Sequence, residues 1–182
     1  MYGLINEGIR ELVISLGGGE MWESMCEEVG VEPEGFEPLC PYHDSLTYSL
    51  VDLAAKKLEI SPDNLLREYG RYWVTYTAQQ GYGEIMNLFG TDFRTFLANL
   101  NRMHAHMGVM MPELHPPRFT VDNVNGSEMV VHYFSQRPGL APMVEGLLEG
   151  LAKKFGETIS IHHIPKGELS DHDVFEVEFQ AL

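Results

Sequence analysis

The amino-acid sequence predicts an α+β fold, with a largely helical first half and an antiparallel sheet of four strands in the second half. Up to about residue 108, apolar residues recur every three or four positions, which is the spacing of helices that bury one face. After Pro117 the apolar period changes to two, which is typical of strands. A single further stretch of helical spacing separates the expected strands, so the helices and the strands are largely segregated along the chain.

Glycine and proline mark the ends of the predicted helices in the first half. The run Gly17-Gly18-Gly19 ends the first helix, and Gly108 ends the last. Ser61 followed by Pro62 is a helix start, with serine as the cap and proline in the first turn. Thr91 or Asp92 caps another. The predicted helices cover residues 4–16, 20–29, 45–58, 62–81 and 92–107.

The second half reads as two pairs of strands around one helix. A turn at Asn125-Gly126 joins the first pair of strands. Pro142 opens a helix that extends to about Phe155. The predicted strands cover residues 118–124, 127–136, 158–164 and 173–179. The length of the chain suits one domain over residues 1–182.

Charge and cysteine content exclude several classes of function. Twelve basic and 27 acidic residues give a net charge of −15, which repels nucleic-acid phosphates and anionic lipid. We therefore expect neither a nucleic-acid partner nor a membrane. The two cysteines, Cys26 and Cys40, have no metal-binding or disulfide spacing. No apolar stretch is long enough to span a bilayer, and these features together predict a cytoplasmic protein.

His104 is the first candidate for chemistry. It follows Phe96 and Leu100 by eight and four positions, so it lies on the apolar stripe of its predicted helix. A neutral imidazole that faces an apolar cleft is the usual proximal ligand of haem iron. The alternative is a buried histidine that is hydrogen-bonded to a carbonyl group.

Tyr133, Ser135 and Arg137 form the second candidate group. Alternate residues of a strand share a face, so two hydroxyls and a guanidinium should point the same way. Together they can grip a carboxylate or a phosphate. The alternative is an ordinary polar strand face.

An apolar stripe of Met143, Leu147 and Leu151 follows this anion clamp. The stripe can line a pocket for a hydrophobic ligand, or it can simply pack in the core. Taken together, the three features describe a large planar apolar ligand with carboxylates at one edge and a metal at its centre. Haem fits that description.

The same residues carry a resemblance to a known family. The opening MYGLIN, the pattern Phe96-Leu97-x-x-Leu100-Asn101-x-x-His104, and Pro117 thirteen residues later are similar to the H-NOX family, the haem domains of bacterial gas sensors and of soluble guanylate cyclase. Tyr133-x-Ser135-x-Arg137 resembles the family's YxSxR signature. The match spans essentially the whole chain. It implies the H-NOX fold, with haem between a distal helical lobe (1–85) and a proximal lobe with the sheet (86–182).

The resemblance also implies a role for each site residue. The cofactor is haem b, iron protoporphyrin IX. His104 is the proximal iron ligand, Pro117 presses on the porphyrin, and the propionates bind the side chains of the YxSxR signature, namely Tyr133, Ser135 and Arg137. The distal side, where the gas binds, is lined by Ile5, Trp73, Met143 and Leu147.

The resemblance further implies a preference among gases. Members that hold oxygen have a tyrosine on the helix after the signature, whereas residues 139–144 contain none. Because NO needs no hydrogen-bond donor, we expect a sensor of NO and CO that excludes oxygen, although the indole of Trp73 is a possible donor. The alternatives are an oxygen-binding haem protein and a non-haem module that binds another carboxylate.

The chain carries no sign of catalysis of its own. No kinase, cyclase or Walker motif is present, so we expect no enzyme activity. Because no output motif is present, we expect the signal to pass to a partner protein in trans or to a further domain, and the resemblance makes a histidine kinase the first expectation.

Overall fold

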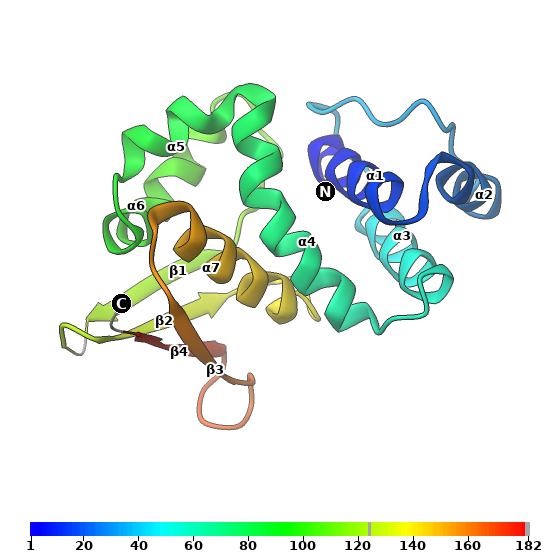
Figure 1. Ribbon diagram of the computed structural model, residues 1–182. Coiled ribbons are helices and arrows are strands. Elements are labelled where there is room, and N and C mark those ends of the chain that lie inside the picture. Colours follow the sequence, from blue (N-terminus) through cyan, green and yellow to red (C-terminus); the bar gives the residue numbers. More distant parts are fainter. Residues whose placement is uncertain (124, 181–182) are drawn as a thin grey trace.

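The computed structural model describes residues 1–123 and 125–180. Its first half consists of α-helices, as the sequence predicts, and the sheet follows (Figure 1). None of the helices in the described ranges combines the length and the apolar character needed to cross a membrane. The helices of this half are α1 (Gly3–Gly17), α2 (Gly19–Val29), α3 (Asp44–Lys57), α4 (Pro62–Thr77), α5 (Gly83–Phe89) and α6 (Phe93–Met107).

The second half is a four-stranded antiparallel sheet with one helix, α7 (Ala141–Phe155), packed against it. The strands follow the order β1-β2-β4-β3, and every neighbouring pair is antiparallel. This confirms the predicted fold class. The expected strand end at Val124 lies outside the described residues. The strands are β1 (Arg118–Asn123), β2 (Glu128–Phe134), β3 (Ile159–Ile164) and β4 (Asp173–Phe179).

The described residues bury two large hydrophobic cores and a smaller third cluster, which consists of Tyr2, Leu4, Tyr76 and Met111. One large core lies among α1 to α4 and includes the fully buried side chains of Val13, Met25 and Leu50. The other large core lies between one face of the sheet and the helices α6 and α7, around Phe96 and Phe175. In Figure 1 the helix α4 runs between the two groups of elements, and α7 lies beside it.

The contact between α4 and α7 is the most extensive between any two helices of the described chain. It depends on glycine, because a Cβ atom at Gly70 would overlap the backbone of Met143 and Leu147, and one at Gly146 would overlap the carbonyl group of Arg67. Ion pairs flank the contact, from Arg67 to Glu145 and from Arg71 to Glu149. The two cores are therefore joined through a close contact of helix backbones.

A bend at residues 78–82 separates α4 from α5. The sequence predicts a helix up to Gly81, and this is wrong, since α4 ends at Thr77. Gln80 and Gly81 have non-helical backbone angles, and Gly81 adopts a φ of 90°, which glycine tolerates without strain. The helix α5, which the sequence analysis did not predict, then packs against α6. It is only seven residues long, too short for its periodicity to be recognised.

The predicted helix caps are confirmed. Ser61 Oγ accepts a hydrogen bond from the backbone N–H of Asn64 at 3.2 Å. Asp92 accepts one from the N–H of Thr95 at 2.9 Å, so Asp92 rather than Thr91 is the cap of α6. These bonds satisfy donors at the first turn of each helix and fix where α4 and α6 begin.

Replacing Gly146 with alanine tests the contact between the helices. The added methyl group would collide with the backbone of α4, so the free energy of unfolding should fall by about 1–3 kcal/mol in urea titrations. Gly19→Ala in α2 is the matched control, since open space surrounds that position. It should leave stability unchanged or raise it by up to about 1 kcal/mol. Equal stability of both variants would contradict the account of the contact.

Candidate functional site

A cavity of about 470 Å³ lies between the two cores. Most of its wall is apolar, and the lining side chains come from α1, α3, α4, α5, α6, α7 and the sheet. Every site residue that the sequence analysis selected lines this cavity. They are Ile5, Trp73, His104, Pro117, Tyr133, Ser135, Arg137, Met143 and Leu147.

His104 reaches the cavity from the last turn of α6. The apolar stripe of that helix buries Phe96, Leu97 and Leu100, and Leu97 and Leu100 line the cavity with His104, as the spacing predicts. Three residues before it, the side-chain amide of Asn101 bonds both backbone groups of Phe119, donating at 2.5 Å and accepting at 2.9 Å. These two hydrogen bonds tie α6 to the start of β1 and so fix the histidine relative to the sheet.

The imidazole of His104 is largely shielded from solvent, though not fully buried, and is uncharged at neutral pH. Burial lowers the pKa of His104 below its ordinary value, and the backbone of Pro117 opposes that effect only in part. Its Nδ1 atom is buried, and no group in the described part of the chain makes a well-formed hydrogen bond to it. A buried polar atom without a partner is uncommon in native proteins and calls for an explanation.

The anion clamp lies at the end of β2. Tyr133 is buried on the inner face of the sheet, and burial raises the pKa of its hydroxyl, with Ser135 opposing, so it stays a donor at neutral pH. The predicted strand to Gln136 is too long, because β2 ends at Phe134. A turn follows, in which Ser135 Oγ accepts from the N–H of Arg137 at 3.0 Å. This turn, rather than strand alternation, directs Arg137 toward the cavity.

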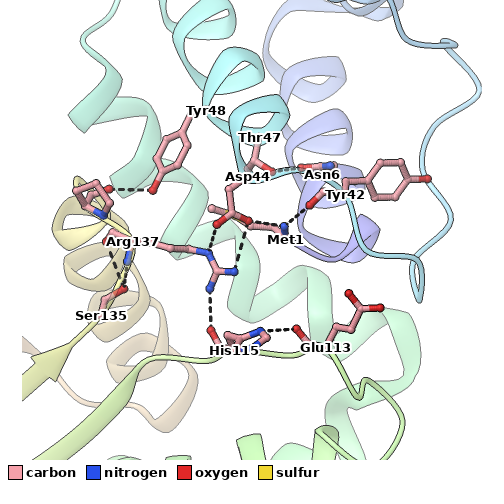
Figure 2. Close-up of polar contacts among 11 residues, drawn as sticks. Met1, Asn6, Tyr42, Asp44, Thr47, Tyr48, Glu113, His115, Ser135 and Arg137 are labelled. Carbon is pink, nitrogen blue, oxygen red and sulfur yellow. Dashed lines mark hydrogen bonds and ion pairs between the residues drawn. The ribbon is translucent and has the colours of Figure 1, made fainter.

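Arg137 is held by a network that the sequence analysis did not foresee (Figure 2). Its Nε donates to Asp44 Oδ2 at 2.7 Å, and its Nη1 donates to the carbonyl oxygen of His115 at 2.7 Å. Asp44, at the start of α3, also accepts from the amino group of Met1. Burial alone would raise the pKa of Asp44, but the hydrogen bonds from Arg137 and Met1 outweigh it and lower that pKa. A cation is therefore fixed at the edge of the cavity.

No signal in the sequence identifies Asp44 as the partner of Arg137, since the two residues are 93 positions apart. Tyr48, one turn further along α3, also reaches this edge, where its hydroxyl donates to the carbonyl oxygen of Pro138 at 2.9 Å (Figure 2). The helix α3 thus approaches the segment after β2 at two points. Only the fold brings these groups together.

The wall opposite His104 is aromatic and aliphatic. The Trp73 ring packs against Tyr69 and Tyr76, with ring centroids 5.8 Å apart in each case. Gly8 on α1 permits this packing, because a Cβ there would lie 2.9 Å from the Tyr69 hydroxyl. That hydroxyl donates to the carbonyl oxygen of Ile5 at 2.7 Å, so its proton is already engaged. This wall offers few hydrogen-bond donors to a ligand.

The site is suited to a large apolar ligand that carries a metal and anionic groups. The lining is apolar, a neutral imidazole lies on one wall, and a fixed guanidinium with two hydroxyls lies at the edge. The backbone of Pro117 acts on this imidazole as a hydrogen-bond partner, and a metal-ligating histidine usually gives its second ring N–H to such a carbonyl group. The residues present therefore fit haem.

Comparisons with known proteins agree with this chemistry. A family model described as Haem-NO-binding matches residues 2–163. The chain is 31% identical over 190 residues to soluble guanylate cyclase gcy-32 and 30% identical over 193 residues to gcy-34, both of Caenorhabditis elegans. These matches cover 96% and 98% of the chain but only 28% of each relative. The chain thus spans less than a third of the length of these relatives.

Solved structures share the fold at lower identity. An H-NOX protein from S. oneidensis in the Fe(II)NO state has a TM-score of 0.89 at 21% identity, with all of both chains covered. An oxygen-binding H-NOX domain related to soluble guanylate cyclases, solved as the oxygen complex, has a TM-score of 0.82 at 23% identity. That match covers all of this chain and 96% of the other. One fold therefore serves proteins that were solved with different gases.

The lowered pKa of His104 predicts a pH dependence of the haem-free protein. The unfolded chain binds a proton at His104 near pH 6.5, while the folded chain resists it, so stability is full above that pH and falls as the pH drops through the folded pKa. Urea unfolding at pH 8 and pH 5.5 should show a smaller loss for His104→Leu than for the wild type. An identical loss in both would mean that His104 is not buried in its neutral form.

Proposed function

The chain belongs to the haem-NO-binding family, also called H-NOX, and on that premise we propose that it binds haem b in the cavity and senses NO and CO there. Proteins of this family are haem-binding gas sensors. The observation that carries the proposal is the largely buried, neutral imidazole of His104, which lines an apolar cavity. When bound, the haem would supply a ferrous iron that takes up a diatomic gas.

His104 would be the iron ligand, and α6 would hold it in place. The bonds from Asn101 to the backbone of Phe119 would keep the imidazole from tilting with the helix end. Pro117, which lines the same cavity, would press on the porphyrin from this wall. Because Pro117 directly precedes β1, the sheet restricts its movement away from the cavity.

Tyr133, Ser135 and Arg137 would bind the haem propionates. Two hydroxyl donors and a guanidinium match a pair of carboxylates in charge and in hydrogen bonding. Asp44 already engages Arg137, and it would share the guanidinium with a propionate rather than release it. The α3 helix would therefore remain tied to the cofactor's edge.

The distal wall supports selectivity for NO and CO over oxygen. Ile5, Met143 and Leu147 offer no donor, and the Tyr69 hydroxyl is engaged with the Ile5 carbonyl group. Oxygen held on ferrous iron is polarised and gains from a donor, whereas NO does not depend on one. The indole N–H of Trp73 is the one group named in the sequence analysis that could reverse this preference.

An oxygen-binding protein is the second candidate, since an oxygen-binding H-NOX domain shares the fold. A non-haem module that binds another carboxylate is the third, and Arg137 supports it. The absorption spectrum separates these candidates. A stable change of the ferrous spectrum in air would favour the second, and a protein that takes up no haemin would favour the third.

The signal would pass to a protein in trans. The relatives are more than three times longer than the matched segment and are guanylate cyclases, so the sensing segment accounts for only part of such proteins. For this chain we propose a separate cytoplasmic signalling partner, with a histidine kinase as the first expectation. Such a partner would have to distinguish the two states of the sensor by affinity.

Replacing His104 with glycine tests the iron ligand. The variant should lose haem, or show an altered ferrous spectrum that returns when imidazole is added to the solution. His106→Gly is the matched control, because His106 lies exposed on the same helix and carries the same cost of glycine in a helix. It should keep the wild-type spectrum. An unchanged spectrum in His104→Gly would refute the ligand assignment.

A donor placed at Leu140 tests the basis of gas selectivity. Leu140 lines the cavity at the start of α7, next to the apolar distal wall. Leu140→Tyr should raise the oxygen affinity about tenfold, the value of one added hydrogen bond. Leu140→Phe adds a ring of the same shape without the hydroxyl and should bind oxygen no better than the wild type. Equal oxygen affinity in the two variants would show that a missing donor does not set the preference.

A further inference from the structure

The outer face of the sheet carries a histidine pair that the haem site does not use. Along β2, Tyr133 points toward the core, while its neighbours His132 and Phe134 take the opposite face. His172 meets them there from the segment between β3 and β4. Its ring stacks on Phe134, with centroids 4.0 Å apart, so its position is set by packing.

The two histidines face each other, and each has an aspartate behind it. His132 Nδ1 lies 2.8 Å from His172 Nε2. The other nitrogen of His132 lies 3.3 Å from Asp122 Oδ2, and the other nitrogen of His172 lies 2.8 Å from Asp171 Oδ1. The four side chains therefore form one line, Asp122–His132–His172–Asp171.

The protons along this line can be arranged so that a metal ion takes the place of the one at its centre. A carboxylate only accepts hydrogen bonds, so His172 directs its Nδ1–H to Asp171 and presents the lone pair of Nε2 to His132. In the neutral pair, the N–H at His132 Nδ1 donates to that lone pair across 2.8 Å. If His132 carried its proton on the nitrogen that faces Asp122 instead, both inner nitrogens would present lone pairs that a metal ion could bind.

The outer contacts match the surroundings of a metal-binding histidine. Such a histidine almost always gives its second N–H to a carboxylate or a carbonyl group, which orients the ring and raises its basicity. His172 has that arrangement with Asp171 at 2.8 Å, and Asp122 lies 3.3 Å from the outer nitrogen of His132. Their side chains are 24% and 15% exposed, so an ion can reach them from solvent while the rings stay held in place.

The charges around the pair favour a cation on balance. Asp122 and Asp171 each contribute a full negative charge, and the chain as a whole carries −15. Arg118, which lies over the Phe134 ring, and Lys166, which is close enough to Asp171 to help lower the pKa of that carboxyl, oppose it. Glu176 adds a negative charge on β4, opposite Val130 in the register.

We propose that His132 and His172 form a surface binding site for one divalent transition-metal ion, for which Zn²⁺ is the reference probe. Imidazole nitrogens suit zinc, copper and nickel, and Zn–N bonds of about 2.0–2.1 Å would place the nitrogens roughly 3.3 Å apart in a tetrahedral site. The two nitrogens need to move apart by only about half an ångström to reach this separation.

Water would complete the coordination. In the described ranges no three His, Cys, Asp or Glu side chains gather closely enough to chelate an ion. With two protein ligands, we expect a dissociation constant in the micromolar range. The ion would link the β3–β4 connection to β2, the strand that carries Tyr133.

Competition with a chromophoric zinc chelator tests the proposal on the purified full chain. The wild type should bind one Zn²⁺, and His132→Ala and His172→Ala should each weaken binding at least tenfold. His162→Ala is the matched control, an exposed histidine on β3 that should bind as the wild type does. Far-UV circular dichroism and the haem spectrum of each variant establish that it is folded.

Two further results distinguish a metal site from a pair that shares only a proton. Zn²⁺ should raise the melting temperature of the wild type and of His162→Ala but not of the two site variants. Asp122→Asn, which removes one outer acceptor, should weaken zinc binding by a smaller factor than loss of either histidine. The absence of saturable binding of one ion by the wild type, or equal affinity in all variants, would overturn the proposal.

Discussion

The close contact of α4 with α7 is the constraint on which the rest of the structure depends. It joins two hydrophobic cores that would otherwise be separate, and it does so through backbone atoms because Gly70 and Gly146 carry no Cβ. The two helices bring Trp73 and Met143 to the lining of one cavity. A larger residue at either glycine would move α7 away from α4 and would change the shape of the space in which the ligand is expected to lie.

The polar edge of the cavity holds the positive charge of Arg137 where anionic groups of a ligand should bind. Arg137 receives its position from the turn at Ser135, from Asp44 on α3 and from the carbonyl group of His115. These contacts come from both halves of the chain. The same edge that would bind the propionates therefore also links the two halves, so ligand binding and the relative placement of the halves are physically coupled.

Local patterns in the sequence predict the elements and part of the site. Helical spacing places His104 on the buried face of α6, and strand alternation places Tyr133 on the inner face of β2. The positions of Ser135 and Arg137 follow from a turn that alternation does not describe. Two contacts join residues that are far apart in the chain, namely Arg137 with Asp44 and His132 with His172. No local sequence pattern predicts such contacts. The bend at Gly81 is missed because a glycine within a helical pattern is compatible with either outcome.

The most direct test of the central claim is the absorption spectrum of the reduced protein after addition of haemin, recorded under argon, in air and with NO. We expect a haem spectrum that does not change in air and changes with NO, because His104 is the proposed iron ligand and the proposed distal wall offers little to stabilise oxygen. The absence of any haem band would contradict the assignment of the cavity, and a stable change in air would contradict the proposed selectivity.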